Sequence, residues 1–206
     1  MLNDDYADMT AIVPEGARGK ARIEHFTVSE QESSFTRIRE MAHPGEYVPA
    51  GNYCRLFVGH SLMMTDTLLE RKTNRGVIYN AKGDVLIAGL GIGLILVPIL
   101  AKAEVRTVTI VEKYRDVIDL VEPSVRKLPG AEKLTIIEAD IFEWVPPKGQ
   151  KWDCIYFDIW ADISTDTLKD MERLHKKFGR RKKPGAWMES WRRGFLQLQR
   201  ERGGCY

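Results

Sequence analysis

The chain has 206 residues, a length that suits one domain with a small extension and allows a substantial core. Hydrophobic residues make up 44%, charged residues make up 29%, and the net charge is +2, as in ordinary globular proteins. The longest apolar run, 85–101, has the length of a strand plus a helix and contains three glycines and a proline, which argues against a membrane span.

The number and spacing of the cysteines indicate whether the chain forms disulfides or binds a metal. The three cysteines, Cys54, Cys154 and Cys205, are far apart and odd in number, which argues against a disulfide framework and against a zinc site. The first residues, MLNDDYADMT, are acidic and polar, unlike a secretory signal. We therefore expect no metal and a cytoplasmic location.

Residues 1–82 are predicted to form an extension of strands and helices. ARIEHFTV (21–28) indicates a strand, and Ser29 with Glu32 has the spacing of a capping box that begins a helix. That helix carries apolar residues at helical spacing: Phe35, Ile38 and Met41.

A hairpin and a further helix complete the extension. The segment 53–66 indicates two short strands around Gly59 and His60. A helix is expected to follow from about Asp66 to Tyr79.

Residues 83–206 alternate between strand and helix patterns. Four apolar segments indicate strands: 84–88, 106–112, 134–140 and 152–158. Helical patterns lie between them and over 167–178. This order predicts an α/β, Rossmann-like, doubly wound and mostly parallel sheet. We also expect a last helix over about 186–202, with four apolar residues as core or interface: Trp187, Trp191, Phe195 and Leu198.

Three glycines follow the first of these strands at every second position. In an open parallel sheet, ligands bind at the carboxyl ends of the strands, and glycine lets a ligand approach bare backbone. We therefore expect Gly89, Gly91 and Gly93 to contact a ligand; a tight turn without a ligand is the alternative. Position 94 is leucine, so the G-x-G-x-x-G dinucleotide pattern is absent, and a P-loop is absent too.

Carboxylates end the next three strands. Glu112 lies 19 residues beyond Gly93, where an acid can bind both hydroxyls of a ribose. Asp140 is expected near an exocyclic amine of a purine, and Asp158 near the reactive part of the ligand. Three acids at successive strand ends favour a nucleotide-like ligand over separate helix caps.

The stretch VLIAGLGIG resembles the class I S-adenosylmethionine-dependent methyltransferase fold, and within it the spermidine synthase-like branch. The resemblance implies cofactor contacts from the three glycines, a ribose contact from Glu112 and an adenine contact from Asp140 with Ile141. It also implies that Asp158 occupies the place of the catalytic acid.

The sequence departs from this family at three places. The acid that typical methyltransferases carry two places before the first glycine is replaced by Ile87. Ile92 replaces an acid of the aminopropyltransferase loop, and the D-x-x-D-P stretch is replaced by DIWADIS, with Asp158 and Asp162 four apart.

These features predict an S-adenosylmethionine-dependent methyltransferase that acts on a small-molecule acceptor. Asp158 is the candidate base or acceptor clamp, and Asp162 is the second candidate. Trp160 is expected to pack over the adenine or the sulfonium, or to be a rim aromatic without that role. His60 is either an acceptor-pocket residue or a plain turn histidine.

Two alternatives remain open. The first is an aminopropyltransferase that uses decarboxylated S-adenosylmethionine. The second is a non-catalytic cofactor binder or an RNA-associated module, because residues 167–206 hold 12 Lys and Arg against 4 Asp and Glu, a net charge of +8. A homodimer through the last helix or the hairpin is also left open.

Overall fold

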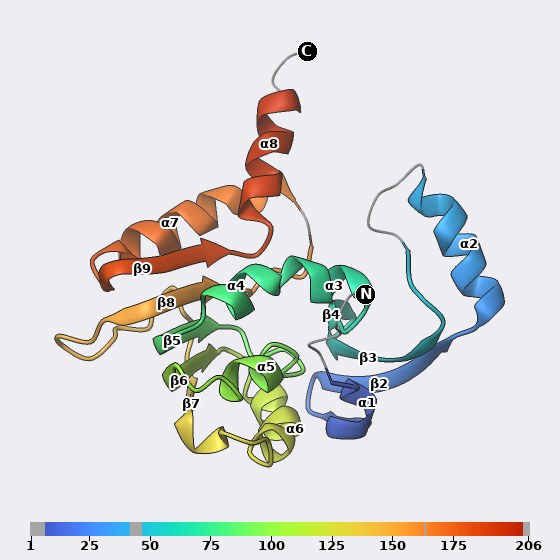
Figure 1. Cartoon of the computed structure of the whole chain (residues 1–206), viewed down its shortest axis with the longest axis horizontal. Helices are drawn as coiled ribbons and strands as arrows, with labels where there is room; N and C mark the ends of the chain where they lie inside the picture. The colour runs from blue at the N-terminus through green and yellow to red at the C-terminus, as the bar shows by residue number, and fades with distance from the viewer. Residues whose placement is uncertain (1–6, 42–46, 163, 204–206) are drawn as a thin grey trace.

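The computed structural model describes residues 7–41, 47–162 and 164–203. Residues 1–6 of the predicted extension (1–82) lie outside the described residues, as do residues 204–206 of the predicted second part (83–206), which include Cys205. The described chain forms two sheets, an antiparallel sheet of four strands and a parallel sheet of five strands (Figure 1). The α/β, Rossmann-like architecture predicted from the sequence is therefore confirmed.

The antiparallel sheet has the strand order β1-β2-β3-β4, with each strand hydrogen-bonded to the next along the chain. Its members are β1 (Gly16–Arg18), β2 (Ala21–Val28), β3 (Gly51–Val58) and β4 (Ser61–Thr65). The turn of the predicted hairpin contains Gly59 at φ 62°, a backbone conformation that glycine adopts readily. A short helix, α1 (Met9–Ile12), precedes this sheet.

Helix α2 (Glu30–Glu40) connects β2 to β3 and begins at the predicted capping box. The Ser29 hydroxyl accepts from the Glu32 amide at 3.2 Å, and the Glu32 carboxylate accepts from the Ser29 amide at 2.8 Å. These reciprocal bonds satisfy donors that the first turn leaves free, so a local signal sets this boundary.

The single helix expected over 66–79 is wrong, because the structure has α3 (Leu68–Thr73) and α4 (Arg75–Asn80). Asn74 separates the two and is fully buried. Its side-chain oxygen accepts from the Tyr156 hydroxyl at 2.9 Å, and its side-chain nitrogen donates to the Glu70 carbonyl at 3.1 Å. The contact with Tyr156 on the distant strand β8 and the contact with Glu70 on α3 hold Asn74 at ψ −2°, where the regular helix is interrupted.

The parallel sheet has the strand order β7-β6-β5-β8-β9. Its members are β5 (Gly83–Ala88), β6 (Val105–Glu112), β7 (Leu134–Glu138), β8 (Trp152–Phe157) and β9 (Lys182–Ser190). Strand β5 lies in the centre, and its residues 85–88 are fully buried. Burial on both faces explains why this strand reads as a continuous apolar run and not as an alternating pattern.

Helices cover both faces of the parallel sheet, as a doubly wound fold requires. Val85 and Ile87 pack in one core with residues of α4, of α5 (Leu96–Leu100) and of α6 (Arg115–Val125). Leu86 and Ala88 face the opposite core, which contains residues of α7 (Leu168–Gly179). Two single 3₁₀ turns complete the elements: Ala131–Lys133 and Thr165–Thr167.

The helix expected over 186–202 is also wrong in its first half. Residues 182–190 form β9, and α8 covers Arg193–Gly203. Strand β9 pairs in parallel with the open edge of β8, and the Trp187 ring stacks on Tyr156 at 6.0 Å between centroids. Pairing of backbone groups with β8 therefore overrides the helical spacing of the apolar residues.

An ion-pair network joins the amino ends of four parallel strands. Asp84 on β5 accepts from Arg106 on β6 at 2.9 Å and from Lys183 on β9 at 2.7 Å. Lys183 also contacts Asp153 on β8 at 2.8 Å. The network fixes the edge of the sheet opposite to the carboxyl ends.

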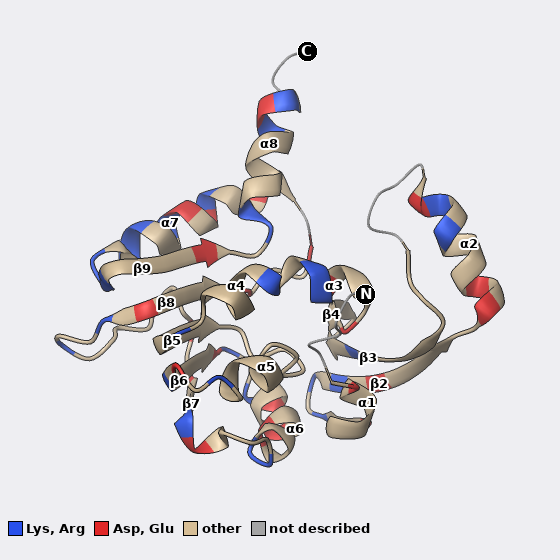
Figure 2. Cartoon of the chain, viewed as in Figure 1, with Lys and Arg blue, Asp and Glu red and all other residues tan. Residues whose placement is uncertain are grey.

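The basic C-terminal segment lies on α7, the start of β9 and α8 (Figure 2). On the surface, Arg173 lies 3.8 Å from Glu143, and Arg200 lies 3.6 Å from Glu172. Both are surface pairs. RNA binding by this segment stays a prediction. Among the described helices, none combines the length and apolarity needed to cross a membrane.

Candidate functional site

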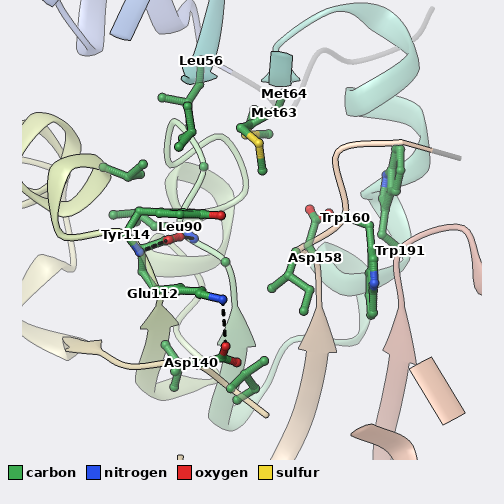
Figure 3. Close-up of a pocket in the computed structure, with 18 of the residues that line it drawn as sticks. Leu56, Met63, Met64, Leu90, Glu112, Tyr114, Asp140, Asp158, Trp160 and Trp191 are labelled. Carbon is green, nitrogen blue, oxygen red and sulfur yellow. Dashed lines mark hydrogen bonds and ion pairs between the residues drawn. The ribbon is translucent and has the colours of Figure 1, made fainter. Parts of the chain in front are cut away.

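A cavity of about 280 Å³ opens at the carboxyl ends of the parallel strands (Figure 3). Its walls come from both sheets: the antiparallel sheet supplies Leu56, Met63 and Met64, and the strand ends supply polar groups. Seven of the nine residues predicted for the site line this cavity: Gly89, Gly91, Glu112, Asp140, Ile141, Asp158 and Trp160. Its volume lies just below the roughly 300–1,000 Å³ of typical ligand pockets.

The three glycines are required by the protein's own packing. All have positive φ: 98° at Gly89, 53° at Gly91 and 79° at Gly93. A Cβ atom would overlap the Asp158 carbonyl oxygen at Gly89, the Met64 sulfur at Gly91 and the Val125 side chain at Gly93. Gly89 and Gly91 line the cavity, whereas Gly93 packs against α6, so a tight turn alone accounts for glycine at these positions.

Glu112 ends β6 and holds the glycine turn in place. Glu112 is only 6% exposed. Its carboxylate accepts hydrogen bonds from the backbone amides of Leu90 and Tyr114, each at 2.8 Å. Burial raises the pKa of Glu112, and the backbone hydrogen bonds oppose that shift. The same carboxylate lines the cavity, where it can accept further donors.

Asp140 lies two residues beyond β7 on the same side of the cavity. Its carboxylate accepts from the Phe142 amide at 2.9 Å and pairs with the Lys113 ammonium at 2.9 Å. Burial raises the pKa of Asp140, but the contacts with Lys113 and Phe142 together outweigh it and lower the pKa below its usual value. Asp140 is therefore an ionised acceptor, next to the buried Ile141.

Two carboxyl groups interact at the other side of the cavity. Asp158 follows β8, and burial raises its pKa to about 7. Glu70 comes from α3, and burial together with the charge of Asp158 raises its pKa to about 8, while Arg192 opposes the shift. Near neutral pH the pair therefore retains a proton and carries negative charge, which suits it to accept a proton or to attract a cation.

Aromatic rings flank these charges on both sides (Figure 3). Tyr114 lies beside Glu112, whereas Trp160 and Trp191 lie beside Asp158. The Trp191 indole donates to the Thr73 hydroxyl at 3.0 Å, which fixes this ring between α3 and the end of β9. The cavity thus has aromatic surfaces next to both groups of acids.

Besides Gly93, two other residues predicted from the sequence lie away from the cavity, and the sequence analysis missed some residues that line it. Asp162 is exposed and does not line the cavity, and His60 is exposed at the hairpin turn. The sequence could have indicated Tyr114 as a site residue, since it lies two residues after Glu112, the acid that ends a strand. No sequence pattern indicated Glu70 or Trp191 as site residues, because their position at the cavity depends on how α3 and β9 pack. Within the described residues, no group of three or more His, Cys, Asp or Glu is arranged to hold a metal ion.

The chain resembles known proteins in its structure but not detectably in its sequence. No family model matches the sequence, and no curated protein matches it. The chain is similar to a spermidine synthase from Thermotoga maritima, with 16% identity, a TM-score of 0.49, and coverage of 82% of this chain and 53% of that one. It is also similar to the methyltransferase CcbJ from Streptomyces caelestis, with 13% identity, a TM-score of 0.45, and coverage of 56% and 46%.

A putative methyltransferase from Thermoplasma acidophilum is a further similar structure, with 20% identity, a TM-score of 0.40, and coverage of 52% of this chain and 42% of that one. The chain therefore spans about half the length of these three solved structures. At these scores the likeness assigns neither an activity nor a substrate. The chain's own residues provide the Rossmann-like fold and one cavity at the strand ends that gathers most of the predicted site.

Proposed function

We propose that the protein is an S-adenosylmethionine-dependent methyltransferase with a small-molecule acceptor. One observation carries this proposal: a single cavity holds Glu112 and Asp140 on one side and the interacting pair Glu70 and Asp158 on the other. The first side suits a nucleoside, and the second suits a positively charged reactive group.

On the side of Glu112 and Asp140, the cavity offers hydrogen-bond acceptors and an aromatic surface that suit adenosine. Each oxygen of the Glu112 carboxylate accepts one backbone amide, and a carboxylate has about four acceptor positions, so ribose hydroxyls can donate as well. Asp140 would accept from the adenine amine beside Ile141. The Tyr114 ring beside Glu112 offers a stacking surface for the base.

The charged side fits the other end of the cofactor. S-adenosylmethionine, when bound, supplies an activated methyl group on a sulfonium. Trp160 and the carboxyl pair would face that positive charge. Ile87 and Ile92 occupy the two positions where related enzymes carry acids, and both side chains are fully buried. In place of those acids, Glu70 would bind the amino group of the cofactor.

Asp158 would act as the base for the acceptor. With a pKa of about 7, its carboxylate is a much stronger base near neutral pH than an ordinary aspartate. It accepts the proton that the acceptor loses as the methyl group is transferred.

Aminopropyl transfer is the second candidate, and the same carboxyl pair favours it. Two acids can bind an amine acceptor or the amine of decarboxylated S-adenosylmethionine. Arg192 argues for the carboxylate-bearing cofactor, because its charge acts on Glu70, which lines the cavity. A guanidinium there can pair with a carboxylate that the decarboxylated form lacks.

Calorimetric titration with S-adenosylmethionine, decarboxylated S-adenosylmethionine and S-adenosylhomocysteine tests both candidates. Binding of the two carboxylate-bearing forms should weaken by about tenfold or more in Glu112→Gln and Asp140→Asn, since each loses a charged hydrogen-bond acceptor. Glu138→Gln is the matched control, because Glu138 pairs in register with Glu112 but does not line the cavity.

The three ligands separate the outcomes. Preference for the carboxylate-bearing forms supports methyl transfer, and preference for the decarboxylated form supports aminopropyl transfer. A folded protein that binds none of the three refutes both candidates.

A further inference from the structure

Cations mark the starts of three neighbouring strands of the parallel sheet. Lys82 directly precedes β5, Lys151 directly precedes β8, and Lys182 is the first residue of β9. These strands are neighbours in the order β5-β8-β9, and Lys182 pairs in register with Trp152, the residue after Lys151. Because neighbouring strands lie about 4.8 Å apart, the amino edge of the sheet carries a short row of positive charge.

Two further segments extend this row. Lys176 lies in the last turn of α7, Arg180 follows that helix, and Lys148 lies in the loop before β8 (Figure 2). The Arg181 guanidinium donates to two backbone carbonyls of the loop 147–150, at 3.0 Å and 3.4 Å, which holds the loop against the start of β9. Six cations thus form one surface, called the basic edge below: Lys82, Lys148, Lys151, Lys176, Arg180 and Lys182.

The basic edge carries charge that the protein does not neutralise. Five of its residues are exposed and Lys182 is half-buried, and none of the six side chains forms an ion pair with an acid of the described residues. Asp84, beside this edge, pairs with Arg106 and Lys183. Asp153 pairs with the same Lys183 ammonium at 2.8 Å. The nearest acids are therefore already paired, and the six cations together attract a polyanion.

An exposed aromatic ring lies at one end of the basic edge. Tyr79 comes three residues before Lys82 and is 85% exposed. The Lys102 ammonium donates to the carbonyls of Ile78 at 2.8 Å and Tyr79 at 3.3 Å, which fixes the backbone beside this ring. Proteins that bind single-stranded nucleic acid combine cations for the phosphates with aromatic rings on which bases stack. The bases of a duplex already stack on each other, so the ring favours a single strand.

We propose that the basic edge binds single-stranded nucleic acid through its phosphates, with one base stacked on Tyr79. This proposal does not depend on methyl transfer, because the basic edge lies at the amino ends of the strands and the cavity lies at their carboxyl ends. The bound strand is a second ligand and not the methyl acceptor. Contacts to phosphates carry no sequence information, so binding should depend little on the base sequence.

Fluorescence anisotropy of a labelled uridine oligonucleotide tests the phosphate contacts. Six contacts predict that the logarithm of the association constant falls with the logarithm of the salt concentration, with a slope of about −4. The double variant Lys151→Gln with Lys182→Gln should weaken binding about tenfold and reduce the slope to about −3, because two contacts are lost.

A second double variant, Lys20→Gln with Lys72→Gln, is the matched control. Both lysines are exposed, one in the turn between β1 and β2 and the other on α3, so the control removes the same charge away from the basic edge. It should bind the oligonucleotide like the original chain. Circular dichroism verifies that each variant is folded.

Two more changes test the single strand itself. Tyr79→Ala should weaken binding about tenfold and leave the salt slope unchanged, because the ring stacks on a base but carries no charge. Tyr79→Phe retains the ring and should bind like the original chain. A deoxyuridine oligonucleotide of the same length should bind as well as the uridine one, since neither stacking nor phosphate contacts involve the 2′-hydroxyl.

Four results would overturn the proposal. The first is a folded chain that does not bind the oligonucleotide at low salt. The second is an equal loss of affinity in the two double variants, which would leave only attraction by net charge. The third is an unchanged affinity of Tyr79→Ala. The fourth is binding to vesicles of phosphatidylcholine and phosphatidylserine that is lost in the Lys151 and Lys182 variant and exceeds binding to the oligonucleotide, which would assign the basic edge to a membrane surface.

Discussion

Replacing Glu70 by glutamine should make the protein more stable at alkaline pH. Glu70 shares its buried position with Asp158, and its pKa is raised from 4.5 to about 8 by burial and by that neighbouring charge. The folded state therefore binds the Glu70 proton more tightly than the unfolded state does. Stability from this group is present below the unfolded pKa and is lost as the pH rises through the folded pKa. Glutamine keeps the shape and has no proton to lose.

The size of the expected change in the free energy of unfolding follows from the pKa shift of Glu70. Each unit of pKa corresponds to about 1.4 kcal/mol, so a rise from 4.5 to about 8 sets an upper limit of about 5 kcal/mol. Solvent reaches part of this carboxyl at the cavity wall, which screens the charge and reduces the effect. Between about pH 5 and pH 9, the free energy of unfolding should therefore fall by about 2–3 kcal/mol more in the original chain than in Glu70→Gln.

Urea unfolding at both pH values measures this difference directly. Glu143→Gln is the matched control, since the Glu143 side chain is 80% exposed and its loss should change neither value. If Glu70→Gln loses as much stability as the original chain between the two pH values, Glu70 is not buried against Asp158. That result would also remove the carboxyl pair from the proposed site.

Three further changes test other parts of the structure. Gly91→Ala should lower the free energy of unfolding by about 1–3 kcal/mol, because φ is 53° there and the new methyl group meets Met64; an unchanged urea midpoint would contradict this. Tyr114→Ala should weaken S-adenosylmethionine binding about tenfold if the ring stacks on adenine, and calorimetry with an equal affinity would remove that role. Asp84→Asn should destabilise the sheet by about 1–2 kcal/mol at neutral pH, since Lys183 and Arg106 lose their shared acid; the loss should shrink below about pH 4, where the unfolded Asp84 binds a proton.

Local sequence decided those features whose physical cause lies within a few residues. The capping box of Ser29 and Glu32 begins α2 as predicted, because both of its hydrogen bonds join neighbours in the chain. The continuous apolar run of 85–88 predicted a buried parallel strand, because both faces of such a strand are covered. The acids Glu112, Asp140 and Asp158 reach one cavity because parallel strands end at the same edge of a sheet.

Tertiary structure decided everything that depends on a distant partner. The helix expected over about 186–202 begins only at Arg193, because residues 182–190 form β9 on the open edge of β8, which offers backbone hydrogen bonds. Glu70 becomes part of the site through the packing of α3 beside a strand end 88 residues later in the chain, at Asp158. The sequence predicted a helix with Phe35, Ile38 and Met41 at helical spacing, but not that these side chains would be exposed. Periodicity describes one element, whereas the surface against which that element packs is a property of the whole fold.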